Sequence, residues 1–332
     1  MCAAKPDDPR KVRRVKGGFK LDNLSVRGVV PTISSLFYPE YKYADATQGQ
    51  LKAKPTSVHP VGNGTTGQER GRRVDEEITF LVNALAKFDL KPDLLASLPR
   101  DADAFIKSLP TRATKFKSKF RSLMENMHPF TRNFFKLMHS KGWAAVAAQV
   151  NVASGTARVG TAIDVVVADA SGKHILLEIK CGYYTYLKRY SANMHKPYQK
   201  LTNCPLNQFM LQLEVGRLLY RRQFRSRSLS SCFVVVLHEY GTNCYALSTA
   251  VTSQSAELWK LLVMTASQNS RQRQQVKTVA RQALRRKQAQ PPPPKPQPVK
   301  RKASKPRKPK VYSAPKTVAS LRVTFDWMKL ME

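Results

Sequence analysis

The sequence predicts an α/β fold in which a helix, three strands, a second helix and a fourth strand follow one another. Apolar residues recur at helical spacing over residues 72–88, which indicates the first helix. From Trp143 the pattern changes to short runs rich in β-branched residues, divided by Gly and Ser turns. A helical pattern returns near residue 205, before one more apolar run at 231–240. This order predicts a mixed sheet flanked by helices.

The first helix is expected to begin near Arg72, in the run "RRVDEEITFLVNALAKF". Its first turn carries Asp75, Glu76 and Glu77, where the helix dipole favours negative charge. Two or three further helices are expected in a helical insertion over residues 90–142. The apolar face of the first helix consists of Ile78, Leu81, Val82, Leu85 and Phe88.

Three strands then follow in the runs "WAAVAAQVNV", "RVGTAIDVVVAD" and "HILLEIKCGY". The last two are separated by "DASGK", residues 169–173, which has the composition of a tight turn. A helix is predicted in "PLNQFMLQLEVGRLLYRRQF", a buried strand in "SCFVVVLHEY" and another strand in "NCYALS".

The charge of the chain points to a polyanionic partner. Its 332 residues include 57 Lys or Arg and 22 Asp or Glu, for a formal net charge of +35. Nucleic acid is the first expectation and an anionic membrane surface the second. No apolar run is long enough to predict a transmembrane helix, and the first residues lack the apolar stretch of a signal peptide. The five cysteines are scattered without zinc-ligand spacing, so reduced thiols in the cytosol or nucleus are expected.

Composition divides the chain into four parts. Residues 1–66 are expected to form a partly ordered basic N-terminal arm, with a short strand or helix near "ISSLFYPEY". Residues 67–270 form the main domain. Residues 271–315 read as a disordered basic, proline-rich tail, and 316–332 as a short docking segment. The tail contains "KRKASKPRKPK", an extended basic peptide of the kind that a nuclear import receptor binds, so we expect location in the nucleus.

A small group of charged residues stands out within the predicted strands. Glu178 and Lys180 alternate along one apolar strand and therefore share a face. Asp164 is the lone charge within the apolar run of the neighbouring strand and can point to the same place. Because unpaired buried charge is costly, this grouping suggests a site. Two carboxylates beside a lysine can hold Mg²⁺ and activate water against a phosphodiester. The alternative is that the charges are structural.

On these motifs the chain resembles the PD-(D/E)xK nuclease superfamily, particularly its RecB-like and phage lambda exonuclease-like branch, which includes viral alkaline exonucleases. The resemblance covers residues 67–247. It rests on "GRRVDEEI" as the first helix, "GTAID" and "LEIK" as the two motif strands, and "LQLEVGRLLY" as the second helix. It implies a restriction-endonuclease-like core of α-β-β-β-α-β order with disordered basic tails.

The resemblance also implies roles for individual residues. Asp164, Glu178 and the carbonyl of Ile179 would hold Mg²⁺, for which Mn²⁺ would substitute. Lys180 would orient or deprotonate the attacking water, and Gln212 would hydrogen-bond near that water or the DNA. A further metal ligand would come from Asp75, Glu76 or Glu77, with the two glutamates slightly favoured.

The sequence departs from the family pattern at two places. The histidine of RecB-like enzymes is replaced by Asp75 or a neighbouring glutamate. The position four after Gln212 is Gly216 rather than tyrosine. The four-cysteine iron–sulfur arrangement of some relatives is absent, so no cluster is expected.

Basic and aromatic residues near these motifs are candidates for DNA contacts. Arg70, Arg72 and Arg73 could touch phosphates at the start of the first helix. Tyr183, Lys188 and Arg189 follow the "LEIK" strand, where they could clamp a strand or simply pack under a loop. The basic run "RRQFRSRS" is either solvated surface or a DNA track.

The sequence therefore predicts a Mg²⁺-dependent deoxyribonuclease, an exonuclease of viral or mobile-element replication or recombination. Its expected partners are DNA, a single-strand annealing or replication protein, and the import receptor, with no membrane partner. The alternative is a non-catalytic basic nucleic-acid-binding protein.

Overall fold

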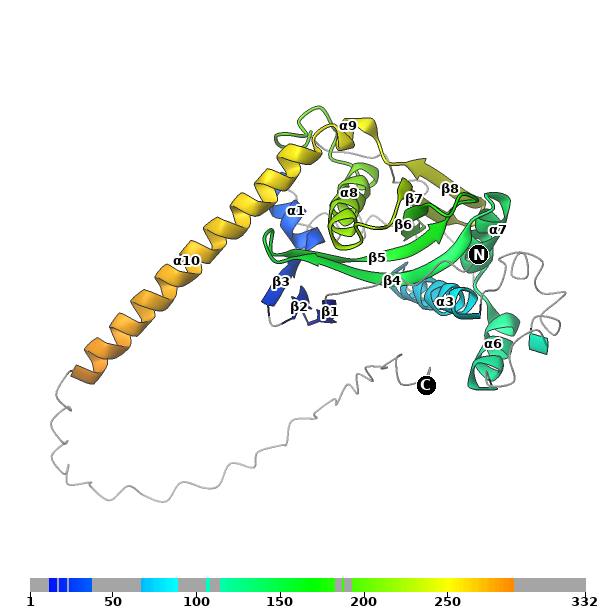
Figure 1. Ribbon diagram of the computed structural model, residues 1–332, viewed down its shortest axis with the longest axis horizontal. Helices are drawn as coiled ribbons and strands as arrows, with labels where there is room; N and C mark the ends of the chain where they lie inside the picture. Colours follow the sequence, from blue (N-terminus) through cyan, green and yellow to red (C-terminus); the bar gives the residue numbers. More distant parts are fainter. Residues whose placement is uncertain are drawn as a thin grey trace, which may run out of the picture. The chain divides into compact units, whose positions relative to one another are not determined.

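A mixed eight-stranded sheet with helices on both faces forms the body of the protein (Figure 1). The structure is a computed structural model. It describes residues 12–16, 18–22, 24–37, 67–88, 106–107, 114–182, 187 and 193–289.

The strands are ordered β1-β2-β3-β5-β6-β7-β8, and β4 pairs with β5 outside this path. The strands are β1 (Val12–Val15), β2 (Gly18–Leu21), β3 (Leu24–Gly28), β4 (Ala144–Ser154), β5 (Val159–Ala168), β6 (His174–Cys181), β7 (Leu229–His238) and β8 (Gly241–Ala246). The helices are α1 (Val29–Phe37), α3 (Gly67–Phe88), α6 (Thr114–Asn126), α7 (Pro129–Ser140), α8 (Pro205–Gln223), α9 (Thr249–Thr252) and α10 (Ser255–Ala289).

The expected order of helix, three strands, helix and strand is present in α3, β4, β5, β6, α8 and β7, with α6 and α7 inserted after α3. Figure 1 shows α8 on one side of the long strands β4 and β5, and α3 on the other. Two apolar clusters fill these layers. Leu211 and Val236 belong to the cluster under α8, and Leu81 and Val235 to the cluster under α3.

The turn between β5 and β6 forms at the predicted residues. The Asp169 carboxylate accepts hydrogen bonds from the backbone N–H groups of Ser171 and Lys173. Gly172 adopts a φ of 76°, which glycine tolerates without a steric cost. The two strands pair antiparallel from this turn up to Val165 and Leu177, so the turn sets their register.

The N-terminal segment contributes more than the expected short strand or helix. Strands β1 to β3 form an antiparallel meander. Strand β3 then pairs in parallel with β5 at Val159 and Gly160. Helix α1 includes the expected "ISSLF". Gly160 is needed where β2 and β4 approach, because a Cβ there would lie 3.2 Å from the Phe19 ring and 3.1 Å from the Ala153 Cβ.

These pairings leave an opening within the sheet. On the side of β5 away from β4, β3 pairs at residues 159–160 and β6 pairs at residues 165–168. Among the described residues, no strand pairs with residues 161–164 on that side. Asp164 therefore lies where the sheet splits.

The chain divides into two compact units at Ser270 and Arg271. Helix α10 continues beyond this point to Ala289, into the segment expected to be disordered. The rest of the proposed tail, residues 290–315, and the proposed docking segment, residues 316–332, lie outside the described residues. Within the described part of the chain, no helix combines the length and the apolar character needed to cross a membrane.

Candidate carboxylate site

Glu178 and Lys180 lie on the face of β6 that packs against α8. The Lys180 ammonium forms an ion pair with Glu178 Oε1, and Gln212 of α8 donates a hydrogen bond of 2.7 Å to the same oxygen. The Lys180 Nζ also lies 4.9 Å from the centre of the Phe209 ring, a cation–π contact that fixes its position. Glu178, Lys180 and Gln212 thus form one connected group.

Asp164 joins this group through the backbone of β6. Its Oδ2 accepts a 2.8 Å hydrogen bond from the N–H of Ile179, next to Glu178. The ladder between β5 and β6 stops one residue earlier, at Val165 and Leu177. The Asp164 carboxylate therefore takes the place of a backbone carbonyl of β5 as the acceptor for the Ile179 N–H, where the two strands separate. This hydrogen bond holds the Asp164 side chain beside Glu178. The proposed role of the Ile179 carbonyl remains a prediction.

Asp75 approaches the group from α3, on the opposite face of the sheet. Its Oδ1 accepts a 2.8 Å hydrogen bond from Gln149 Nε2 of β4. The charge of Asp164 raises the pKa of Asp75, and the charges of Arg14 and Lys180 lower it. Acids from α3, β5 and β6 thus influence one another electrostatically.

Burial and mutual repulsion make these acids hard to ionise. Glu178 is only 3% exposed, and burial followed by the charge of Asp164 raises its pKa to about 8. Burial also raises the pKa of Asp164, against the opposing charge of Lys180. Burial and then Asp164 raise the pKa of Asp75 to about 6. Because Asp75 also remains accessible to solvent, water screens part of that shift. Added positive charge at this place would favour the ionised acids.

Gln149 is a site residue that the sequence did not reveal. It lies in β4 between the positions that pair with Val165 and Ile163, so it stands opposite Asp164. Besides holding Asp75, its side chain lowers the pKa of Asp164 through hydrogen bonding. Its φ of 53° is rare for a residue with a side chain and costs about 1–2 kcal/mol. Such strain commonly marks functional positions, but neither the residue type nor its spacing signals it.

Among the three acids at the start of α3, Asp75 interacts electrostatically with Asp164 and Glu178, and which of the three would bind a metal remains a prediction. Glu77 is buried and is held by Arg73, the backbone N–H of His128 and the hydroxyl of Thr131. These contacts tie α3 to the start of α7. Glu76 is exposed on the helix, where its charge raises the pKa of Lys119 against burial, the larger effect. A helix turns by about 100° per residue, so neighbouring acids point in different directions.

The predicted DNA-contact residues are distributed unevenly. Arg70 lies beside the end of β6, since its Nη2 would stand 2.5 Å from a Cβ at Gly182. Arg72 is exposed, and Arg73 is engaged by Glu77 and the carbonyl of Asn126. Tyr183, Lys188 and Arg189 lie outside the described residues. Arg14 of β1, which no motif indicated, lowers the pKa values of Asp75 and Asp164.

The glycine that departs from the family pattern lies on the side of α8 toward β5. A Cβ on Gly216 would lie 3.7 Å from side-chain carbons of both Thr161 and Ile163. Gly216 therefore faces β5, where a Cβ would make ordinary van der Waals contacts.

The donor set fits a hard divalent cation in its chemistry. Asp75, Asp164 and Glu178 offer carboxylate oxygens, which Mg²⁺ prefers over nitrogen or sulfur. Their pKa values are raised because the nearby positive charges do not offset the effect of burial. In the described part of the chain, however, no three His, Cys, Asp or Glu side chains converge closely enough to hold a metal ion.

Comparisons with known proteins add little to this geometry. No protein-family model matches the chain, and no curated protein matches it. A solved structure described as "Crystal structure of SSO0001" is similar over 56% of this chain and 84% of its own, with 14% sequence identity and a TM-score of 0.22. A similarity at this level carries no argument about fold or function.

Proposed function

We propose that the protein is a Mg²⁺-dependent deoxyribonuclease built on a restriction-endonuclease-like PD-(D/E)xK core. The observation that carries the proposal is the linkage of Asp164, Glu178, Lys180 and Gln212 at the split in the sheet. A structural ion pair would not need additional acids, yet besides burial, the larger effect, the charges of Asp164 and Asp75 raise the pKa of Glu178. A net charge of +35 supports a polyanionic substrate.

Each residue has a role that follows from its contacts. Asp164, Glu178 and Asp75 would hold Mg²⁺, whose charge lowers the pKa of bound water and stabilises the phosphate. Gln212 would keep Glu178 turned toward the opening. Lys180, which pairs with Glu178, would hydrogen-bond the attacking water or the phosphate oxygen that gains charge. Gln149 would hold the carboxylates of Asp75 and Asp164 in fixed positions relative to each other.

The experiment compares end-labelled linear duplex DNA with closed circular duplex DNA, each incubated in Mg²⁺ or in EDTA. Loss of the linear substrate alone, in Mg²⁺ alone, is expected for an exonuclease. Cleavage of both substrates would make the protein an endonuclease. The Glu257→Gln protein serves as a control, since Glu257 is a partly exposed acid on α10.

A non-catalytic nucleic-acid-binding protein is the second candidate. It is favoured by the lack of a converged group of three metal-binding side chains in the described residues. This candidate predicts that both DNA forms bind but that neither is cut in Mg²⁺ or Mn²⁺.

The setting of the enzyme is part of the same proposal. We infer a role in viral or mobile-element replication or recombination inside a nucleus, with a single-strand annealing or replication protein as a partner. The basic segment "KRKASKPRKPK" would bind the import receptor. Fusing residues 295–312 to a cargo too large to diffuse through nuclear pores tests this, and a cargo that stays cytoplasmic would refute import.

A further inference from the structure

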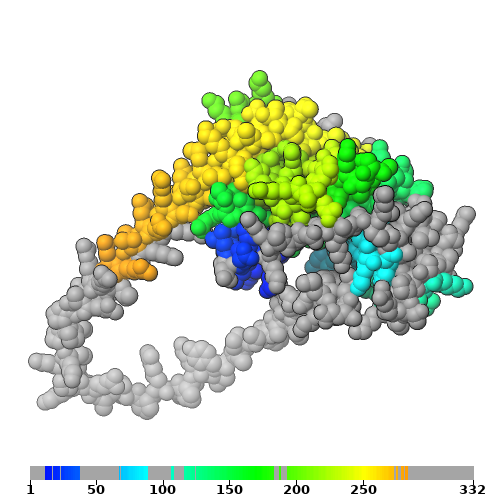
Figure 2. Space-filling model, viewed as in Figure 1, coloured from blue at the N-terminus to red at the C-terminus, as the bar shows by residue number. Residues whose placement is uncertain are grey.

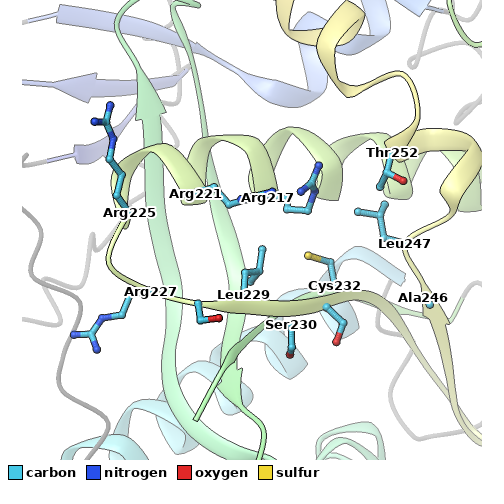
Figure 3. A pocket seen from close by; sticks show the side chains of 12 residues that line it. Arg217, Arg221, Arg225, Arg227, Leu229, Ser230, Cys232, Ala246, Leu247 and Thr252 are labelled. Atoms are coloured by element: carbon cyan, nitrogen blue, oxygen red, sulfur yellow. The ribbon is translucent and has the colours of Figure 1, made fainter. Parts of the chain in front are cut away.

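A polar cavity lies beside the C-terminal half of α8, beyond Gln212. Its volume is about 690 Å³, and it is enclosed by the end of α8, the loop after it, and strands β7 and β8 (Figure 3). Figure 3 shows Arg217 and Arg221 along the helix, and Arg225 and Arg227 at one end of the pocket. We refer to these four residues and the cavity they line as the arginine pocket.

The lining of the arginine pocket is strongly cationic. The residues that line it include four arginines and three serines, Ser228, Ser230 and Ser231, and neither aspartate nor glutamate. Burial raises the pKa of Cys232 to about 12, and the charges of Arg217 and Arg221 oppose this rise. Both guanidinium groups therefore stand close to the pocket wall.

One arginine is fixed in place, and others are open to solvent. Arg217 makes two hydrogen bonds to the fully buried Glu214, of 2.6 and 2.7 Å, and a third to Ser255. This framework anchors the pocket wall without placing an acid in the cavity. Arg221 and Arg225 are exposed, so their guanidinium groups can turn toward a ligand without losing buried contacts.

We propose that the arginine pocket binds phosphodiester groups of a nucleic-acid strand. Guanidinium groups match phosphate oxygens with paired N–H donors, and serine hydroxyls add further donors. Such contacts position a strand without reading its sequence. The proposal rests on nucleic acid being the substrate of the carboxylate site.

The position of the pocket on α8 favours a polymer over a small phosphorylated compound. At about 1.5 Å per residue, Gln212 and Arg221 lie about 14 Å apart along the helix. At about 3.4 Å per nucleotide of a duplex strand, that spacing corresponds to about four nucleotides. In the space-filling view, α8 lies beside the first part of α10 on one face of the molecule (Figure 2). A strand bound at the carboxylate site is long enough to reach the pocket.

The test is the salt dependence of binding to a duplex oligonucleotide, measured in EDTA so that cleavage plays no part. The Arg221→Gln/Arg225→Gln protein removes two exposed charges from the pocket. The Lys136→Gln/Lys141→Gln protein removes two exposed charges from α7 and the residue after it, as a matched control. Thermal melting of both proteins verifies that they are folded.

In the pocket variant, the slope of log affinity against log salt concentration is expected to be smaller in magnitude by about 1.8. This corresponds to about 0.9 for each of two lost phosphate contacts. The control should change the slope much less. Equal slopes in the two variants would overturn the proposal.

A second arm measures pyrophosphate binding by calorimetry. If pyrophosphate binds the wild type but not the pocket variant, while the DNA slope stays unchanged, the pocket serves a small phosphorylated ligand and the nucleic-acid assignment fails. Because neither arm requires cleavage, a failed nuclease assay leaves both readouts interpretable.

Discussion

Helix α8 contacts two sites of opposite charge. Near its middle, Gln212 donates a hydrogen bond to a buried glutamate that lies beside two further acids and one lysine. Toward its end, Arg217 and Arg221 of the helix, with Arg225 and Arg227 of the loop after it, line a cavity whose lining contains no acid. One helix thus connects a site with a surplus of acids to a pocket with a surplus of arginines. A metal ion and a phosphate chain are complementary to these two places.

The carboxylate site and the arginine pocket also differ in how far their charged side chains are buried. At the carboxylate site the acids are desolvated, so protonation or a cation must relieve them. At the arginine pocket, Arg221 and Arg225 are exposed to solvent, and Arg217 is anchored by the buried Glu214. The buried site is therefore suited to chemistry, and the hydrated pocket to positioning.

The largest expected effect comes from removing charge at the buried site. Glu178→Gln or Asp164→Asn should lower cleavage by at least about a thousandfold, within the range for an essential catalytic group. Duplex binding should remain within about threefold, because it rests on the surplus of basic residues. Initial rates and filter binding measure the two quantities. A Glu178→Gln protein that cleaves DNA at the wild-type rate would contradict the assignment of this group as the active site.

The next effect separates two neighbouring acids on α3. Asp75→Asn should lower the cleavage rate by about a hundredfold with little change in melting temperature. Glu77→Gln should instead cost about 2 kcal/mol of folding free energy, because it weakens two charge-assisted hydrogen bonds to a buried carboxylate and its ion pair with the half-exposed Arg73, while the folded protein stays active. Chemical denaturation and rates per folded molecule distinguish them. Equal losses of activity would contradict the placement of Asp75.

A third prediction concerns pH and Mg²⁺. The pKa of Glu178 rises from 4.5 to about 8, so between these values the folded protein keeps a proton that the unfolded chain releases. In EDTA, stability should therefore fall as pH rises through this window. Mg²⁺ should raise the melting temperature more at pH 8 than at pH 6, because it binds the ionised acids.

The matched variants for this pH test are Glu178→Gln, which should flatten both trends, and Glu257→Gln, which should not. Scanning calorimetry at the two pH values supplies the measurement. A Mg²⁺ effect that is independent of pH and of Glu178 would place the ion elsewhere.

The smallest effect is expected at Gln149. Gln149→Gly and Gln149→Ala both remove the amide that bridges Asp75 and Asp164, so each should slow cleavage by about tenfold. The glycine variant should be more stable than the alanine variant by about 1 kcal/mol, because glycine adopts positive φ without steric cost. Denaturant titration measures the difference. Equal stabilities would mean that the backbone relaxes around this position.

The sequence by itself determined the main elements and part of the site. Alternation of apolar residues places Glu178 and Lys180 on one face of β6, and the turn at Asp169–Lys173 fixes their register against Asp164. These features are local, because the period of a strand and the chemistry of a turn depend on residues close in sequence. The mixed sheet with its flanking helices follows from their order.

Only the tertiary structure decided which acid of α3 faces the site and which other residues meet there. Asp75, Glu76 and Glu77 are equivalent by composition, and the packing of α3 against α7 takes Glu77 away. Gln149 and Arg14 reach the acids because β4 lies beside β5 and the N-terminal strands join the sheet far from their place in the chain. Strand pairing across long sequence separations leaves no local pattern, so these contacts exist only in the folded protein.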